Sequence, residues 1–481
     1  MTGRHGSGGA ASARLRAAAS ALALLLWAAG CSDDKASPST FTREELRDPE
    51  TCKECHADHY REWSGSMHAY AAEDPVFRAM NAKGQEATDG ALGDFCVSCH
   101  APLAVKEGLT RDGLDLDSVP KALHGVTCTF CHQVEAVEGT HNNPLRLAGN
   151  TTMRGGISDP VRSRAHDSAY SGLHSGDDLE SSLLCGTCHD IVVPRAVTGA
   201  AEDVHLERTL LEWQESLFSN PDSPTPAACG ASCHMRTAAR DVPIARAPGV
   251  PARPERRSHM FPGVDVALTE FPERDAQRDA VVAFLGQAIS VKVCVEVDVA
   301  IVTLENVGSG HDFPSGATQD RRFWVELQAF DANGNTLAQS GMLPPSGRIT
   351  DDPKAWLFRD RLFGVDGAET HDFWRVATIE RGAIRRPVTA DRSDLRHFES
   401  FAERRYPPFG ALPFRVTVRL RMQPIGRDVL DELVDEGYLE AVHAEAMPIF
   451  TVGGTGPDGE GPTVEWLRSG GKNCASNDDA R

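Results

Sequence analysis

The sequence predicts an α+β multidomain protein, in which a mainly α-helical and loop-rich domain over residues 49–262 precedes a β-sandwich-like domain over residues 286–456. Three observations predict this order. Ten of the 13 cysteines fall in the first segment, in close pairs. From Val291 onward, apolar and polar residues alternate between turn-forming residues, which is typical of antiparallel strands. The length of 481 residues accommodates two or three domains.

The first 30 residues form an expected export signal. Three arginines precede an apolar run at residues 17–29, which is shorter than the ~20 residues that a spanning helix needs. The run ends in Ala-Ala-Gly-Cys31, which resembles a bacterial lipobox, so we expect a lipid on Cys31 and a polar tether over residues 31–48. The alternative is ordinary signal cleavage near the same place. Both alternatives predict an extracytoplasmic protein.

Four segments carry the Cys-x-x-Cys-His pattern that attaches haem c covalently. Two thiols three residues apart on a beginning helix reach the two vinyl groups of the porphyrin, and the next imidazole binds the iron as the proximal ligand. Chance alone predicts about 0.01 such motif in a chain of this cysteine and histidine content. The expected haem-binding residues are Cys52, Cys55 and His56; Cys96, Cys99 and His100; Cys128, Cys131 and His132; and Cys185, Cys188 and His189.

A fifth segment, Cys229-Gly-Ala-Ser-Cys233-His234, has one additional residue between its cysteines. We expect it to bind a fifth haem, because a bulged loop keeps both thiols within reach and the segment ends a regular series. A disulfide or a failed attachment is the alternative for this segment. Zinc binding by the cysteine pairs is an alternative for the whole series, but it does not require a histidine after each second cysteine.

The spacing of the motifs predicts how the first domain is filled. Residues 49–262 offer roughly 40 residues for each haem, far fewer than a separate domain of about 100 residues. The haems must therefore form much of the core and lie close together. Helices are predicted over residues 52–72 and 207–218, and a Pro-rich loop over residues 219–228.

The second half of the chain begins with a Pro- and Arg-rich stretch, followed by a linker over residues 263–285 with a helix expected at 273–287. A late amphipathic helix is expected over residues 427–446, and a mobile tail over residues 457–481. The expected strands are 291–306, 322–330, 336–340, 374–379 and 414–422, with a hairpin turn at 331–335.

Two cysteines lie outside the motifs and the signal, Cys294 and Cys474. Cys294 lies in a strand-like run, where the simplest interpretation is a small buried apolar side chain. A disulfide with Cys474 is the alternative, since an exported location permits one.

Several segments resemble multihaem cytochromes of the cytochrome c-554 type, which are related to the haem fold of hydroxylamine oxidoreductase. These are the Cys52-Lys-Glu-Cys-His motif with Trp63-Ser-Gly-Ser-Met-His68-Ala, then Gly125-Val-Thr-Cys-Thr-Phe-Cys-His, Ser182 to Asp190, and Glu212 to Ser216. The resemblance covers roughly residues 49–262 and implies a haem arrangement, not a substrate. Five motifs, one of them lengthened, depart from the four-haem pattern of this family.

The resemblance also bears on single residues and on the C-terminal part. It implies that His68 is the distal ligand of a neighbouring haem. Further along the chain, Gly310-His-Asp-Phe-Pro-Ser-Gly316 and Phe323-Trp-Val-Glu-Leu are similar to a β-rich module found appended to such cytochromes. That similarity suggests no chemistry by itself.

Each iron needs a sixth ligand or keeps an open position. Besides His68, we expect His141, His174 and His259 to be distal ligands. His124 is expected to bind an iron, or alternatively a haem propionate. Three further histidines are expected at the surface, or in contact with a ligating side chain rather than with an iron: His59, His166 and His205.

Other side chains are alternatives for the sixth coordination position of an iron. Methionine would raise the potential of a haem that it ligates, but it is more often a gap-filling residue. That interpretation applies to the methionines near histidines, which are Met67, Met153, Met235 and Met260. His311 is more simply a loop histidine than a haem ligand from the second domain.

The chain is acidic, with 69 Asp and Glu against 49 Lys and Arg and a formal net charge of −20. Such a surface repels nucleic acid and favours redox partner proteins with basic docking patches. The simpler interpretation is that the charge keeps an exported protein soluble.

Closely packed bis-histidine haems have no open metal position, so the sequence predicts an electron carrier or relay. Ser32 after Cys31 favours attachment to the outer membrane. The rival hypothesis is an enzyme in which one haem lacks a distal ligand and acts on nitrite, hydroxylamine or sulfite, although no Cys-x-x-Cys-Lys motif is present. A third hypothesis is that the β-rich domain binds a partner protein or polysaccharide.

Overall fold

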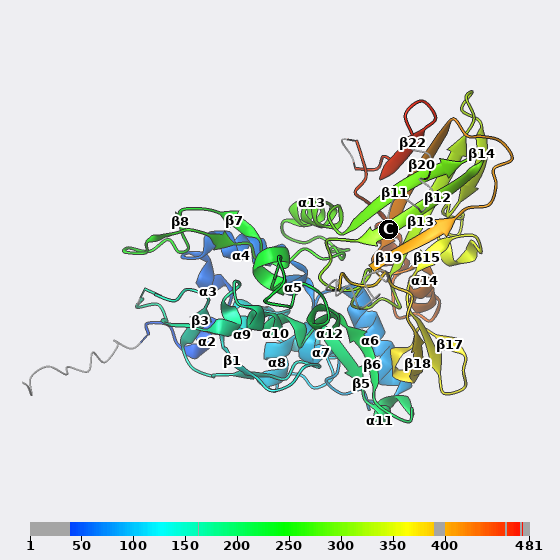
Figure 1. The fold of residues 1–481 in the computed structure, drawn as a ribbon. Coiled ribbons are helices and arrows are strands. Elements are labelled where there is room, and N and C mark those ends of the chain that lie inside the picture. The colour runs from blue at the N-terminus through cyan, green and yellow to red at the C-terminus, as the bar shows by residue number, and fades with distance from the viewer. Residues whose placement is uncertain (1–38, 162, 389–399, 457–458, 472–473, 475–481) are drawn as a thin grey trace, which may run out of the picture.

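The computed structural model describes residues 39–161, 163–388, 400–456, 459–471 and 474. Short helices fill one part of the molecule and larger sheets the other, which confirms the predicted α+β class (Figure 1). The expected export signal and Cys31 lie outside the described residues. No helix within these ranges is both long and apolar enough to cross a bilayer.

The predicted continuous helix over residues 52–72 is wrong. The segment forms three short helices, α3 (Glu50–Lys53), α4 (Ala57–Ser64) and α5 (Met67–Tyr70). The chain turns at Gly65, where a Cβ atom would lie 2.5 Å from the Cβ of Glu273. Ser66 then caps α5, because its hydroxyl accepts a hydrogen bond from the Ala69 N–H.

The predicted helix over residues 207–218 is also shorter than expected. Its first residues belong to strand β6 (Val204–Arg208), whose Val204 and Leu206 are buried, and only Thr209–Gln214 is helical, as α12. The other helices of this part are α2 (Arg43–Arg47), α6 (Pro75–Ala87), α7 (Val97–His100), α8 (Pro102–Lys106), α9 (Cys128–His132), α10 (Ser182–Gly186) and α11 (Arg195–Thr198).

Two-stranded sheets connect the helices of the N-terminal part. One of them, β3 (Thr152–Gly155) with β4 (Asp167–Tyr170), is parallel. The antiparallel pairs are β1 (Val134–Val137) with β2 (Leu145–Leu147), β5 (Asp190–Val193) with β6, β7 (Thr237–Ala239) with β10 (Arg256–Arg257), and β8 (Val242–Pro243) with β9 (Ala252–Arg253). Strands of two to five residues fix loops in place without forming a large apolar core of their own.

The linker helix forms close to its predicted position, as α13 (Arg274–Leu285). It is not a free connection, because Val281 and Leu285 are buried in the same apolar cluster as the following sheets. The boundary between the two parts therefore lies before α13 rather than after it.

Within the described residues, the C-terminal part contains three antiparallel sheets. The largest has the order β14-β13-β20-β21, with β15 also paired to β13 and β22 to β20. Its strands are β13 (Arg322–Phe330), β14 (Thr336–Ser340), β15 (Trp356–Phe358), β20 (Arg415–Gln423), β21 (Phe450–Val452) and β22 (Val464–Leu467). The other two sheets are β11 (Ile289–Glu296), β12 (Val299–Asn306) and β19 (Phe401–Arg405), and β16 (Arg361–Gly364), β17 (Glu369–Thr370) and β18 (Val376–Glu380).

Three predictions for this part need correction. The expected strand over 291–306 is a hairpin of β11 and β12, in which Glu296 pairs with Val299 and Val297 takes a left-handed φ of 55°. The late helix is two helices, α14 (Arg427–Asp435) and α15 (Ala441–Ala446), separated at Gly437 with φ 83°. The tail expected to be mobile contains β22, which pairs with β20.

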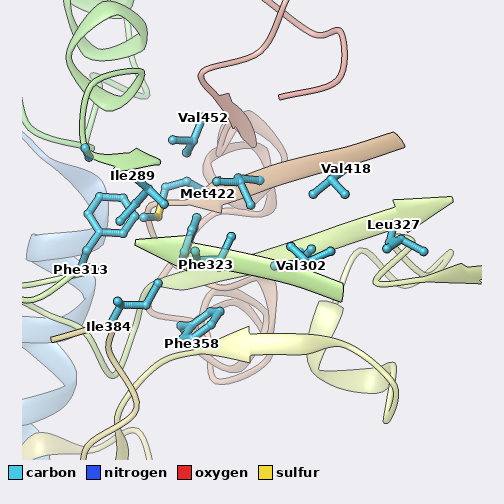
Figure 2. Packing of buried hydrophobic residues seen from close by; sticks show 14 of the residues in the cluster. Ile289, Val302, Phe313, Phe323, Leu327, Phe358, Ile384, Val418, Met422 and Val452 are labelled. Carbon is cyan, nitrogen blue, oxygen red and sulfur yellow. The ribbon is translucent and has the colours of Figure 1, made fainter. Parts of the chain in front are cut away.

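The largest apolar cluster lies between the sheets of β12 and β13. Figure 2 shows Val302 of β12 close to Phe323 and Leu327 of β13, with Met422 of β20 beside them. Loop residues close one end of this cluster, where Phe313 exchanges two backbone hydrogen bonds of 2.8 Å with Ile384. The loop that carries Phe313 is therefore anchored to the core of the C-terminal part.

The two parts of the molecule share buried side chains. Val76 and Ala79 of α6 pack with Leu430 and Leu433 of α14. Lys83 of α6 is buried and forms ion pairs of 2.5–2.9 Å with three carboxylates of the C-terminal part, which belong to Asp372, Glu432 and Glu436. A second shared cluster joins β5 and β6 to β16 and β18.

Cys294 and Cys474 form a disulfide, so the interpretation of Cys294 as a lone buried side chain is wrong and the alternative holds. The bond joins β11 to a segment 180 residues later and closes the C-terminal part as a loop.

Removing this disulfide is expected to lower the free energy of unfolding by about 2–4 kcal/mol, because the crosslink restricts the unfolded chain. The measurement is chemical denaturation of the Cys294→Ser, Cys474→Ser double variant beside the parent under oxidising conditions. Under reducing conditions the two proteins should converge. A difference that persists after reduction would mean that the serine side chains, not the crosslink, cause the loss.

Candidate haem-binding sites

Each of the five Cys-and-His motifs lies on or beside a helical turn. In the first two motifs, the N–H of His56 donates to the carbonyl of Cys52 over 2.8 Å, and the N–H of His100 to that of Cys96 over 3.3 Å. The turn places both thiols and the imidazole on one side of the backbone, as covalent haem attachment requires. All ten motif cysteines are free thiols that are neither fully buried nor exposed.

The fifth motif accommodates its additional residue in a π-helical turn. Residues Cys229–His234 form this turn, and the N–H of Met235 donates to the carbonyl of Gly230, five residues earlier, over 2.7 Å. A π turn holds one more residue than an α turn, so the first and last residues of the longer motif can still lie on the same side of the backbone. The bulge expected from the sequence thus takes a defined form.

Four of the five proximal histidines share one hydrogen-bond pattern. Nδ1 of each of these four lies within hydrogen-bond distance of a backbone carbonyl, which only accepts, so Nδ1 carries the proton and Nε2 keeps its lone pair for a metal. The pairs are His56 with Ile244 at 3.0 Å, His100 with Ala71 at 2.9 Å, His132 with Arg154 at 2.5 Å and His234 with Pro262 at 2.8 Å. Burial lowers the pKa of His132 and of His234 to about 4, so both rings are neutral, as ligation requires.

Thiols of different motifs lie near one another. The Cys52 thiol is a close neighbour of the Cys128 thiol, and the Cys99 thiol of the Cys188 thiol. Because each thiol would attach to the edge of a porphyrin, haems held by the first and third motifs, or by the second and fourth, would have neighbouring edges. Cys185 and Cys229 are close enough to interact electrostatically, which connects the fourth motif to the fifth.

Two proximal histidines face a second histidine at a separation that fits an iron between them. Two imidazoles that bind one metal from opposite sides each lie about 2 Å from it, which places their ring centres roughly 6 Å apart. The ring centres of His68 and His189 are 6.3 Å apart, and those of His56 and His166 are also 6.3 Å apart. The Nδ1 of His166 lies 3.0 Å from the Asp167 carbonyl, so its Nε2 is the free nitrogen.

His132 has two histidine neighbours in nearly parallel orientation. His259 lies 6.5 Å away and donates from Nδ1 to the Arg257 carbonyl, which leaves Nε2 free. His174 lies 5.8 Å away and uses Nε2 for the Cys131 carbonyl, so its buried Nδ1 is left without a partner. Each of the two rings therefore offers one nitrogen for an iron.

The ring of His124, which the sequence predicts to bind an iron or a propionate, contacts a carboxylate and backbone carbonyls. Its Nδ1 lies 2.7 Å from a carboxylate oxygen of Glu73, and its Nε2 lies 3.0 and 3.1 Å from the carbonyls of Leu116 and Val119. Both nitrogens are therefore engaged inside the protein, and the ring is buried. His124 anchors a loop.

The structure does not bring His141 to a proximal histidine. Its ring lies 6.3 Å from that of His205, at 70°, and its Nδ1 lies 3.2 Å from the Thr140 hydroxyl. His166, in contrast, was expected at the surface and lies opposite His56. Backbone hydrogen bonds from Thr40 and Phe41 hold the segment before His166, and no local sequence pattern announces this contact.

Glu207 lies in a buried group of charges beside the fourth motif. Burial raises its pKa from 4.5 to about 7, although Arg321 opposes the rise. Arg321 itself forms two hydrogen bonds of 3.2 Å with Asp265. Arg321 and Asp265 both interact electrostatically with His189.

The Glu207→Gln variant is expected to have nearly the same free energy of unfolding as the parent at pH 5. At pH 8 the free energy of unfolding of the variant is expected to be higher than that of the parent by about 2–3 kcal/mol. The folded pKa lies above the unfolded one, so the contribution of Glu207 is complete below pH 4.5 and is lost as the pH rises through about 7. Urea denaturation of both proteins at pH 5, 6, 7 and 8 measures the difference. A difference that does not change with pH would contradict the prediction.

Comparison with known proteins agrees with this geometry. Residues 51–133, which hold the first three motifs, match the family described as cytochrome c554 and c-prime. No curated protein sequence matches the chain. The fold is similar to that of a penta-heme cytochrome c552 from Thermochromatium tepidum, with a TM-score of 0.57 and 19% identity over 86% of this chain and 98% of that chain. Residues 51–133 therefore carry the cytochrome c554 and c-prime pattern, and the chain shares the fold of a penta-heme cytochrome.

Proposed function

We propose that this chain is an extracytoplasmic pentahaem cytochrome c that transfers electrons along closely packed, mostly bis-histidine haems. The observation that carries the proposal is that thiols of different motifs are close neighbours, the first motif beside the third, the second beside the fourth and the fourth beside the fifth. Bound haem supplies reversible one-electron chemistry at its iron. Haems attached at these neighbouring thiols would have nearby edges and so would give each electron a short path to the next site.

The protein's own residues prepare these sites. Carbonyls such as those of Ile244 and Pro262 hold the proximal imidazoles in one tautomer and one orientation. Burial lowers the pKa of His68 and of His259, each to about 3, so both rings are neutral. Neutral imidazoles on both sides of an iron favour a six-coordinate site with no room for a substrate.

The proposed location outside the cytoplasm has two supports. The Cys294–Cys474 disulfide is typical of an oxidising compartment. Residues 1–30 have the composition of an export signal, and a lipid on Cys31 would tether the chain to the outer membrane. The net charge of −20 suits envelope redox partners with basic docking patches.

The decisive experiment counts haems and determines their spin states in the full-length protein. Mass spectrometry and a pyridine haemochrome assay should give five haems, and electron paramagnetic resonance of the oxidised protein should show mostly low-spin iron. The Cys229→Ala, Cys233→Ala variant should lose one haem and keep the other four. A count of four in the parent, unchanged in this variant, would contradict the fifth site.

A second candidate function is that of an enzyme with one open haem. The observation that favours it concerns His100, whose ring stacks on Phe77 at 3.9 Å and has no histidine ring facing it among the described residues. A five-coordinate iron there would bind a small nitrogen or sulfur compound. A high-spin signal that shifts on adding nitrite or hydroxylamine would support the enzyme. Uniform low-spin iron without any response to these compounds would exclude it.

A further inference from the structure

We propose that His311, from the C-terminal part, is the sixth ligand of the iron held by Cys229, Cys233 and His234. The inference rests on the proposed function and completes its fifth site. It also assigns the C-terminal part a role within the haem array, as the supplier of a ligand.

The fifth motif needs a ligand from elsewhere. The described ring contacts of His234 are with Phe284, at 4.8 Å, and not with another histidine. His68 already faces His189 at 6.3 Å, and His166 already faces His56. The remaining histidines near His132, which are His174 and His259, cluster with the third motif.

His311 lies on a loop that packs close to the residues just before the fifth motif. At the preceding residue, Gly310, a Cβ atom would lie 3.3 Å from Cδ1 of Trp213. The indole N–H of Trp213 donates to the carbonyl of Ala227 over 2.9 Å, two residues before Cys229. One aromatic ring thus separates the His311 loop from the start of the motif.

The loop is fixed at both ends. On the side of the N-terminal part, the Asp312 N–H and the Ser315 hydroxyl donate to the same carboxylate oxygen of Glu212 in α12, over 3.2 and 2.6 Å. On the other side, Phe313 is buried in the apolar cluster of the C-terminal part. A side chain held in this way keeps a constant position, as an axial ligand must.

The imidazole of His311 has the hydrogen-bond pattern of the proximal histidines. Its Nδ1 lies 2.8 Å from the Asp312 carbonyl, so Nδ1 donates and Nε2 keeps its lone pair. His311 is also a close electrostatic neighbour of the fifth motif. It lies near His234 of that motif and also near His189 of the fourth motif.

The test is His311→Ala in the full-length, haem-loaded protein. We expect an unchanged haem count, one haem moved from the low-spin to the high-spin signal relative to the parent, and a return to low spin on adding imidazole. His443→Ala, which removes another histidine of the C-terminal part, should leave the spectrum as in the parent. A folded His311→Ala protein with the parent's spin states would overturn the inference.

A second variant decides the matter if the alanine variant does not fold. His311→Met keeps a long side chain with a thioether, which as an axial ligand raises the midpoint potential of one haem. Potentials identical to those of the parent would overturn the inference. Absence of the fifth haem from the parent would overturn both the proposed function and the inference. Unchanged spin states in His311→Ala, or unchanged potentials in His311→Met, would overturn only the assignment of His311 as a ligand.

Discussion

Replacing His68 with alanine is expected to convert one haem, about a fifth of the total, from low spin to high spin. The ring of His68 lies 6.3 Å from that of His189 and packs on Phe261 at 4.4 Å, so no neighbouring imidazole can take its place without moving this packing. Electron paramagnetic resonance and absorption spectra of the oxidised protein measure the change.

His124→Ala is the matched control for this prediction. His124 is buried, but its nitrogens face Glu73 and backbone carbonyls, so its loss should leave all spin states unchanged and lower the free energy of unfolding by about 1–3 kcal/mol. Equal spectra for the His68 variant and the parent would show that His68 ligates no iron. A new high-spin signal in the His124 variant would restore His124 to the ligand set.

Replacing Arg322 with methionine is expected to lower the free energy of unfolding by about 3–5 kcal/mol, because it removes the bidentate partner of the largely buried Asp428 carboxylate and leaves only His371, at 3.7 Å, beside it. Arg322 is fully buried, and its guanidinium donates to both carboxylate oxygens of Asp428, over 3.1 and 2.6 Å. It also donates to the carbonyls of Gln319 and Arg321, each over 2.8 Å. Chemical denaturation measures the loss.

Two further variants separate the lost ion pair from lost packing. Arg322→Met combined with Asp428→Leu should recover much of the stability, since no unpaired charge then stays buried. Arg361→Met removes a guanidinium that is 41% exposed, and its pairs with Glu369 and Glu380 should cost less than about 1 kcal/mol. A loss at Arg361 as large as that at Arg322 would contradict the role given to burial.

Elements specified by neighbouring residues were predictable from the sequence. Strands β13 and β14 lie at their predicted residues, because Asp331 accepts hydrogen bonds from the N–H groups of Asn333 and Asn335 and so sets the turn between them. The hairpin of β11 and β12 was not predictable in the same way. Its turn contains Val297, an exposed apolar residue that continues the alternation of the strands.

The facing histidines were the least predictable feature. The proximal residues follow from adjacent cysteines, but the opposite imidazole is chosen by the folded chain. His166 reaches His56 because backbone hydrogen bonds position its segment, and His124 is engaged by Glu73. Neither contact leaves a periodic pattern in the sequence, so the sequence alone could not place these two rings.

The position of α13 decides how this protein can be divided. Val281 and Leu285 are buried with the sheets of the C-terminal part, while Gly65 approaches Glu273 at the start of the same helix. A cut at residue 286 would uncover apolar side chains on both fragments, and it would also expose Val204 and Leu206 on the haem-binding fragment. The C-terminal part is thus not a transferable module, and chimaeras that graft it onto another cytochrome must carry α13 with it.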